Sequence, residues 1–269
     1  MFELLKYDFF QNALISTFLI GIICGLVGTY IVAKRMVFIS GGITHASFGG
    51  LGFSYFMGFS PMLGATVFSI LSALGILFLS ENKKIREDSL IGIFWSAGMA
   101  IGVLFIYLTP GYAPNLMSYL FGNILTVTRG QILMSAILCL FILVFFRIFY
   151  RPLFYIAFDK EYSRTHNIPV NWIDTSITLI IALCVVLCMK LAGIILVISY
   201  LTIPQSIAGL FYKNFKQLLI ASSVISTVGS VIGLFASAAL GIPSGATIVI
   251  CFLALFFVCW IIRKIRKNI

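Results

Sequence analysis

The chain of 269 residues is a succession of long apolar runs separated by short polar segments. A helix needs about 20 apolar residues to cross the hydrocarbon core of a bilayer. Spanning strands would alternate apolar and polar residues, whereas these runs are continuous, so helices are the expected elements. The runs cover residues 12–33, 40–58, 61–80, 90–108, 131–149, 173–189, 192–212, 217–238 and 244–262. This pattern predicts an all-α, polytopic helical membrane protein with about 8–9 transmembrane helices in a single transmembrane domain, residues 1–269.

Two segments need a separate interpretation. The run at 12–33 is too long for the core of a signal peptide, so we expect it to be the first span. Residues 118–128 are too few and too polar to cross the bilayer alone. We expect them to form an interfacial or re-entrant piece.

Composition narrows the class of protein. Of all residues, 61% are hydrophobic and 10% are charged, whereas soluble domains carry about 25% charged residues. This balance excludes a water-soluble enzyme, a disordered chain and a DNA-binding protein. A net charge of +10 can indicate nucleic-acid binding, but the cations here lie singly or in short clusters between the apolar runs. The lipid bilayer is therefore the expected partner, and nucleic acid is not.

The positions of Lys and Arg predict the orientation, because cytoplasmic loops carry an excess of both. Basic residues lie at 34–35, 83–86, 147–164, 213–216 and 263–267. If all of these are cytoplasmic, the loops on the opposite side, near 57–61, 109–117, 190 and 239–243, hold only Lys190. The pattern predicts a multi-pass protein of the cell (plasma or inner) membrane, with its N-terminus outside and its C-terminus in the cytoplasm.

Ionisable residues inside a bilayer are costly and mark functional sites. All eight acidic residues lie at the ends of the apolar runs or between them. Proton-driven carriers keep Asp, Glu or His relays in the membrane. A secondary metal or small-solute carrier working without an ATPase is therefore the less favoured alternative. An intramembrane protease is excluded because the runs contain no paired Asp, Ser/His or H-E-x-x-H arrangement, so we do not expect an enzyme.

The second run contains one titratable group, His45. Glycines surround it, together with hydroxyl residues such as Thr44 and Ser47. Small residues let helices approach closely, and glycines also permit unwound turns that line a cavity. Two interpretations stay open. His45 belongs to a tightly packed helix and is satisfied by a hydroxyl or carbonyl, or its imidazole is a ligand for a metal ion in a polar cavity.

Six cysteines lie inside apolar runs and form no C-x-x-C pair. Cys184 and Cys188 are four residues apart and share a helix face, where they could bind a soft ion. Ordinary packing explains them better, because a free cysteine behaves as a small buried hydrophobe.

No G-x-x-x-x-G-K-[ST] loop is present, so the chain needs a partner that binds ATP if it pumps. The polar loop at about 150–172 combines charges of both signs with aromatic residues. It is the candidate docking surface for that partner, and the alternative is an amphipathic helix at the membrane interface.

Several stretches together resemble the membrane permease of metal-ion ABC importers, which take up zinc, manganese or iron, and the zinc-uptake type is the nearest in pattern. The stretches are GTYIVAKRMVFISGGITHASFGGLGF (28–53), REDSLIGIFWSAGMAIGVLF (86–105), SYLFGNIL (118–125), AFDKEYSRTHNI (157–168), KLAGIILVISYLTIPQSIAGLF (190–211) and GIPSGATIVI (241–250). The match runs in order over residues 15–260. The resemblance implies a type II ABC importer permease that works as a pair of copies, with ATP bound by a cytoplasmic ATPase subunit and the metal delivered by an extracytoplasmic metal-binding protein. No cofactor is expected in this chain, whose cargo is a divalent metal ion.

The resemblance implies His45 as a metal ligand of the translocation path and Gly41, Gly42, Gly49 and Gly50 as its packing residues. This chain departs from the family pattern, which has Asp four residues before the His and Pro four residues after it; here Gly41 and Gly49 take those places. Imidazole suits zinc, whereas manganese favours oxygen ligands. The missing carboxylate therefore favours zinc as cargo, with manganese or iron as alternatives.

The resemblance also implies contacts with the ATPase in the cytoplasmic loop. The residues are Asp159 and Glu161 of an Asp-x-Glu motif, followed by Ser163 and Asn167. Asn167 stands where the family has glycine. Asparagine also tolerates left-handed backbone, so we expect the turn to be kept.

Overall fold

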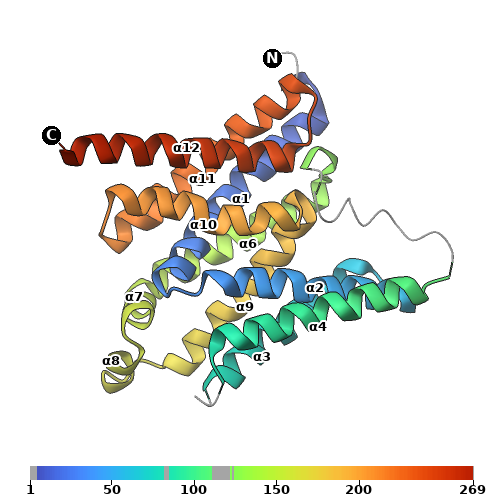
Figure 1. Cartoon of the computed structure of the whole chain (residues 1–269), viewed down its shortest axis with the longest axis horizontal. Coiled ribbons are helices and arrows are strands. Elements are labelled where there is room, and N and C mark those ends of the chain that lie inside the picture. The colour runs from blue at the N-terminus through green and yellow to red at the C-terminus, as the bar shows by residue number, and fades with distance from the viewer. Residues whose placement is uncertain (1–4, 82–84, 111–121, 123, 269) are drawn as a thin grey trace.

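The structure is a computed structural model that describes residues 5–81, 85–110, 122 and 124–268, and all regular secondary structure in them is helical (Figure 1). Its long helices are α1 (Asp8–Ala33), α2 (Val37–Met57), α3 (Pro61–Glu81), α4 (Glu87–Leu108), α6 (Arg129–Ile148), α9 (Val170–Ala192), α10 (Ile194–Phe211), α11 (Phe215–Leu240) and α12 (Ser244–Asn268). The short ones are η2 (Ile124–Thr126), α7 (Tyr150–Phe158) and α8 (Lys160–Thr165). Each predicted apolar run therefore coincides with one long helix.

Within the described residues, eight of these helices are long and apolar enough to cross a membrane. The remaining long helix, α2, is less apolar because it carries many Gly, Ser and Thr residues. Its 21 residues still extend over about 31 Å. Helices α3, α4, α9 and α10 contact α2, and most of its residues are buried. The polar groups of α2 are therefore largely kept away from the lipid-facing surface. The predicted fold class, an all-α permease with about 8–9 spans, is confirmed.

Two groups of helices pack on a central pair. The pair is α1 and α9, which are the most buried of the candidate spans. In the first group, α2 packs against α3 and α4, and α9 of the central pair contacts α2 and α3. In the second group, α10, α11 and α12 pack together, and α1 of the central pair packs on α10 and α11 (Figure 1). One hydrophobic core runs through both groups. Segments far apart in the sequence, α1 and α9, therefore form the centre.

Local signals mark the ends of the helices. Gly58 and Gly241 follow α2 and α11 with positive φ, which glycine adopts without a steric cost. The side chains of Thr128 and Gln131 form a capping box at the start of α6. Of the predicted interfacial piece at 118–128, residues 122 and 124–128 are described and include the short helix η2, whereas residues 118–121 and 123 lie outside the described residues.

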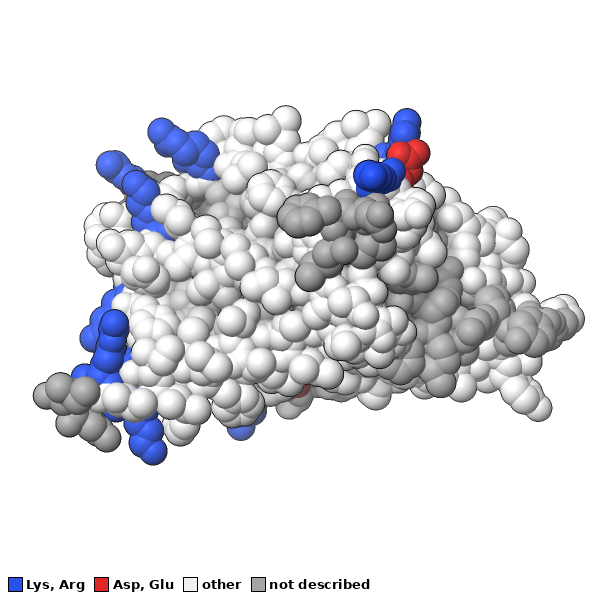
Figure 2. Space-filling model, turned by 90° about the horizontal axis from the view of Figure 1, so that it is seen from above, with Lys and Arg blue, Asp and Glu red and all other residues white. Residues whose placement is uncertain are grey.

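Charged residues gather at the ends of the molecule. Figure 2 shows basic side chains toward the end where α7, α8 and the C-terminus lie, and a middle zone almost free of charge. Large apolar side chains on the outer helices are exposed, including Val103 on α4, Leu140 on α6 and Phe257 on α12. In water such a surface would be costly, whereas lipid chains solvate it. The arrangement is that of a multi-pass membrane protein.

Candidate translocation and coupling sites

His45 differs from its neighbours on α2. Every other residue between Ile39 and Gly52 is buried, and His45 alone is partly exposed. Its ring stacks on the indole of Trp95 from α4, with ring centroids 4.0 Å apart and planes inclined by 10°. The Nδ1 atom is buried and has no hydrogen-bond partner among the described residues. The imidazole is therefore held flat against α4, with one ring nitrogen unused by the protein.

The hydroxyl groups of the residues beside His45 already form hydrogen bonds within the protein. The Thr44 hydroxyl donates to the Ser40 carbonyl oxygen, one turn earlier on α2. The Ser47 hydroxyl is 2.6 Å from the Thr44 carbonyl oxygen and 3.2 Å from the Met189 sulfur on α9. Both side chains are fully buried. The His45 imidazole is thus the side chain on this part of α2 with an uncommitted ring nitrogen, and imidazole suits transition metals such as zinc.

Glycines set the spacing of α2 from α3 and α4. A Cβ on Gly42 would lie 2.7 Å from Ile91 Cγ2, and one on Gly49 would lie 2.8 Å from the Gly98 carbonyl oxygen, both on α4. A Cβ on Gly50 would overlap the Gly64 carbonyl of α3. Only glycine permits these approaches.

Gly41 has a different environment. A Cβ at this position would lie 3.1 Å from Trp95 Cζ3 and 3.5 Å from Ile198 Cδ1. Apolar atoms therefore occupy the space around the position where the family pattern has a carboxylate. An aspartate here would be poorly solvated.

The predicted docking loop forms two short helices, α7 and α8. Asp159 caps α8, and its Oδ1 accepts a hydrogen bond from Tyr162 N at 2.9 Å. Glu161 is exposed and lies 3.3 Å from Arg164 Nη1. Asp159 and Glu161 thus lie on the surface of the segment, where a partner can reach them.

Two residues of the same loop behave differently from each other. Asn167 is exposed with φ of +55°, so the expected left-handed turn is present. Ser163 is fully buried, and its hydroxyl donates to the Asp159 carbonyl oxygen at 2.7 Å. The expected direct contact of the Ser163 side chain with an ATPase is therefore not available in this conformation, because that side chain holds the turn of α8 from inside.

Asp174, near the start of α9, ties the docking segment to the core. Its side chain is only 1% exposed. The distance from Asp174 Oδ1 to Lys34 Nζ is 2.6 Å, and the distance from Asp174 Oδ2 to Lys160 Nζ is 2.8 Å. The Tyr30 hydroxyl donates to Oδ1 at 3.3 Å. A buried carboxylate needs such partners to remain charged. The ion pairs link α8 to the end of α1 and the start of α9.

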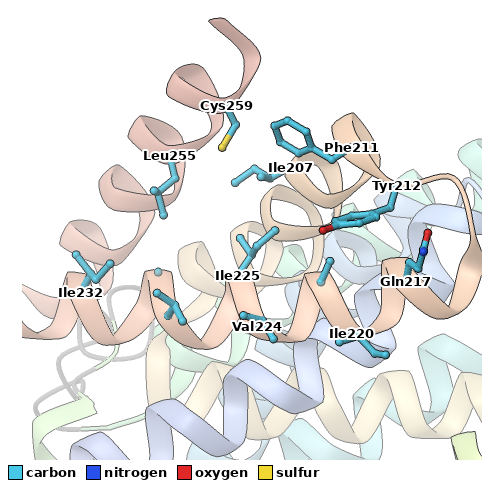
Figure 3. A pocket seen from close by; sticks show the side chains of 13 residues that line it. Ile207, Phe211, Tyr212, Gln217, Ile220, Val224, Ile225, Ile232, Leu255 and Cys259 are labelled. Carbon is cyan, nitrogen blue, oxygen red and sulfur yellow. The ribbon is translucent and has the colours of Figure 1, made fainter. Parts of the chain in front are cut away.

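An apolar cavity of about 580 Å³ lies between α10, α11 and α12 (Figure 3). Ile225 and Ile232 of α11 and Leu255 and Cys259 of α12 point into it, and Gln217 is at one end. None of the described residues that line it is charged. Such a lining cannot replace the hydration shell of a cation, so this cavity is not the candidate path.

Three features were missed by sequence reasoning. Trp95 is an ordinary aromatic residue of an apolar run until α4 places it against His45. In the sequence Asp174 is one of several acids at the ends of apolar runs, and its position as the second residue of the run at 173–189 is a signal of buried pairing. Cys24, on α1, meets Cys184 and Cys188 of α9, and no spacing in the sequence indicates that meeting.

The model of the ABC 3 transport family matches residues 6–263. An uncharacterized membrane protein of Synechocystis sp. (slr2045) is 41% identical over 250 residues, or 93% of this chain and 89% of that protein. The manganese transport system membrane protein MntC of Halalkalibacterium halodurans is 33% identical, over 94% of this chain and 87% of its own. The structure of PsaBC from Streptococcus pneumoniae in complex with Fab superposes with a TM-score of 0.84 and 30% identity, covering 96% of this chain and 92% of that one. The chain therefore belongs to the ABC 3 transport family, which confirms the predicted resemblance to the permeases of metal-ion ABC importers.

Proposed function

We propose that this chain is the permease subunit of an ATP-driven importer of a divalent metal ion, forming the translocation path while a separate ABC ATPase binds and hydrolyses ATP. It lies in the cell membrane with its C-terminus in the cytoplasm. The family match, the spanning helices and the absence of a P-loop motif support this function. The names of relatives that are manganese transport proteins support a metal ion as cargo.

His45 is the observation that carries the proposal for the path. A polar side chain at the middle of a span is costly to keep, and it is the one partly exposed residue of an otherwise buried stretch of α2. Stacking on Trp95 fixes the ring, so a passing ion meets a donor in a defined position. One neutral nitrogen binds weakly, which suits a path because an ion held strongly would not leave.

The docking segment is the proposed contact with the ATPase. Asp159, Glu161 and Asn167 lie on its exposed surface, and Ser163 supports it from inside. Through Lys160 and Asp174, a movement of α8 is transmitted directly to the start of α9 and the end of α1. The two helices so linked are the central pair of the fold.

The assembly contains further proteins. We propose a second copy of this chain, as a homodimer, because one chain leaves His45 partly exposed instead of enclosing it. An extracytoplasmic metal-binding protein would deliver the ion to the opposite side from α7 and α8. Gly42, Gly49 and Gly50 support the path by keeping α2 close to α3 and α4.

The donor set favours zinc as the cargo. His45 supplies nitrogen, the nearby hydroxyls are hydrogen-bonded, and apolar atoms surround Gly41. Manganese prefers oxygen-rich sites, so its stable binding here has little support from the residues. Manganese stays as the second candidate because several relatives are named manganese transporters.

The first prediction tests the dependence on ATP. Proteoliposomes that contain the permease and its ATPase are expected to accumulate zinc only with ATP and the metal-binding protein. A variant of the ATPase that binds but does not hydrolyse ATP should abolish accumulation. The permease alone, given only a pH gradient, should transport nothing. Accumulation under that last condition would instead favour a secondary carrier.

The second prediction concerns His45. His45→Ala is expected to lower metal uptake at least tenfold with unchanged abundance in the membrane, because the ring fills a partly exposed position instead of the core. Leu140→Ala, at an exposed apolar position of α6 outside the docking segment, is the control and should transport normally. Competition between zinc and manganese in the same vesicles identifies the cargo. Normal transport by His45→Ala would mean that the imidazole only packs against Trp95.

A further inference from the structure

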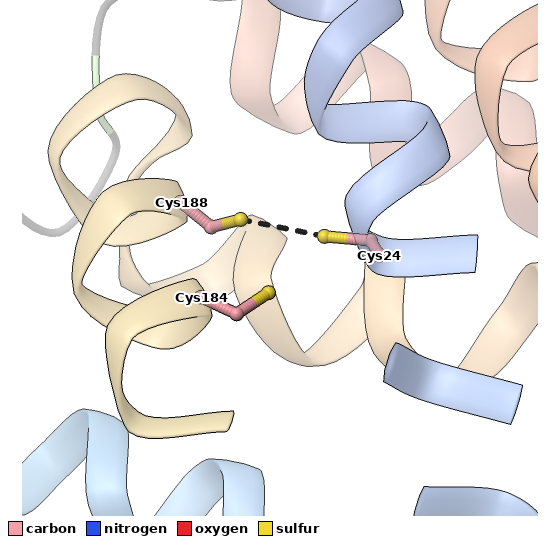
Figure 4. A group of neighbouring side chains, drawn as sticks. All are labelled: Cys24, Cys184 and Cys188. Carbon is pink, nitrogen blue, oxygen red and sulfur yellow. Dashed lines mark hydrogen bonds between the residues drawn. The ribbon is translucent and has the colours of Figure 1, made fainter. Parts of the chain in front are cut away.

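Three thiols from two helices converge inside the protein. Cys184 and Cys188 lie one turn apart on α9, and Cys24 faces them from α1 (Figure 4). The Sγ atoms of Cys24 and Cys188 are 3.3 Å apart, and all three sulfur atoms lie within 4.8 Å of one another. Each residue is fully buried. None of the three is used by the proposed transport mechanism.

We propose that Cys24, Cys184 and Cys188 form a buried binding site for one d¹⁰ metal cation, Zn²⁺ or Cu⁺, which joins α1 to α9. Metal–thiolate bonds of about 2.3 Å place the sulfur atoms of one site about 3.8–4.0 Å apart. The Cys24 and Cys188 sulfur atoms lie 3.3 Å apart and no pair of the three is more than 4.8 Å apart, so small side-chain shifts bring the three atoms to a common centre. Figure 4 shows the side chains directed toward one another from both helices.

The chemistry of the cluster selects a soft ion. Thiolates favour Cu⁺ and Zn²⁺, whereas Mg²⁺, Ca²⁺ and Mn²⁺ favour oxygen. Among the described residues, no carboxylate or imidazole joins this group of sulfur atoms. The thiol site therefore has sulfur ligands, whereas His45 offers a nitrogen. The proposal of a thiol site does not depend on whether His45 binds the cargo.

Charge balance is possible without any nearby ionised side chain. Zn²⁺ is neutralised when two of the three thiols lose their protons, and Cu⁺ when one thiol does so. The released protons go to water as the metal enters, and the thiols that keep their protons, one with Zn²⁺ and two with Cu⁺, bind as neutral ligands. A neutral site avoids the large cost of a net charge in an apolar interior.

The bound ion would act as a link within the fold. Lys34 and Asp174 already join α1 to α9 near one end of the two helices. The thiol cluster lies farther along both helices, ten residues before Lys34 and ten or more after Asp174. A metal at the cluster would hold the central pair together at a second point.

The experiment uses the full chain in complex with its ATPase, purified without metal under reducing conditions. The complex is exposed to Zn²⁺ alone or to Cu⁺ alone, freed of unbound ion and analysed for metal. We expect one retained ion per chain, with three sulfur neighbours at about 2.3 Å by X-ray absorption. Retention of zinc only, of copper only, or of both supports the site and identifies the ion.

Alanine variants locate the ligands. Cys24→Ala, Cys184→Ala and Cys188→Ala should each weaken binding at least tenfold. Cys139→Ala removes a buried thiol of α6 outside the cluster and should bind as the wild type does. If an alanine variant does not fold, the corresponding serine variant takes its place. Failure of the folded wild-type complex to retain either ion, or equal retention when all three cysteines are replaced, overturns the proposal.

Discussion

Asp174→Ala is expected to lower the free energy of unfolding by about 2–4 kcal/mol and to reduce the amount of permease in the membrane. Breaking a buried ion pair costs about 3–5 kcal/mol because the remaining charge is left unpaired. The lysines here are 16% and 28% exposed, so water offsets part of that cost. Thermal unfolding of the permease–ATPase complex measures the effect.

Asp88→Ala is the matched control. Asp88 lies 3.7 Å from Arg86, but both side chains are largely exposed, and exposed pairs contribute little. Its midpoint of unfolding should stay close to that of the wild type. Equal midpoints for the Asp174 and Asp88 variants would show that the buried pairs do not stabilise the fold.

A milder change separates stability from coupling. Lys160→Gln keeps the Lys34–Asp174 pair and removes the ion pair between α8 and Asp174. The expected result is a stable complex that hydrolyses more ATP per ion transported. Lys213→Gln, on the exposed loop between α10 and α11, should leave this ratio unchanged.

Gly50→Ala is expected to destabilise the permease by about 2–3 kcal/mol and to abolish transport. The added methyl group would overlap the Gly64 carbonyl and lie 2.9 Å from Ala65 N, all backbone atoms of α3. Backbone cannot move aside as a flexible side chain does, so α2 and α3 must separate. Expression level and thermal unfolding measure the loss of stability, and metal uptake measures the loss of transport.

Gly209→Ala provides the control for the helical substitution itself. Apart from its chain neighbours and the backbone of its own helix, no described atom lies within 4 Å of a Cβ at Gly209 in α10. Alanine is the better helix former, so this variant should be as stable as the wild type or more stable. A stable, active Gly50→Ala variant would show that α2 has room to shift.

Much of the fold follows from the sequence because the causes are local. Continuous apolar runs of about 20 residues can only be helices in a bilayer, and each predicted run became a helix. The left-handed turn at Asn167 follows from the tolerance of asparagine for positive φ. His45 was singled out because it is the one titratable side chain in its run.

The burial of Ser163 shows where such reasoning ends. Its position in the loop motif indicated a contact with the ATPase, but the side chain turns inward and bonds to the Asp159 carbonyl. A motif specifies which residues share a short segment. It does not specify which side of that segment packs on the protein, since this depends on neighbours from α9 and α7.

The sequence alone determined the class of protein, the number of helices to within one, the absence of a G-x-x-x-x-G-K-[ST] motif and the position of the one mid-span imidazole. Only the tertiary structure decided that His45 stacks on Trp95, that Asp174 joins two lysines 140 and 14 positions away in the chain, and that Cys24 meets two cysteines of α9. The physical reason is the range of the interactions. Apolar length and turn propensity act within a few residues, whereas these three meetings depend on how helices distant in the sequence cross and rotate when their side chains pack.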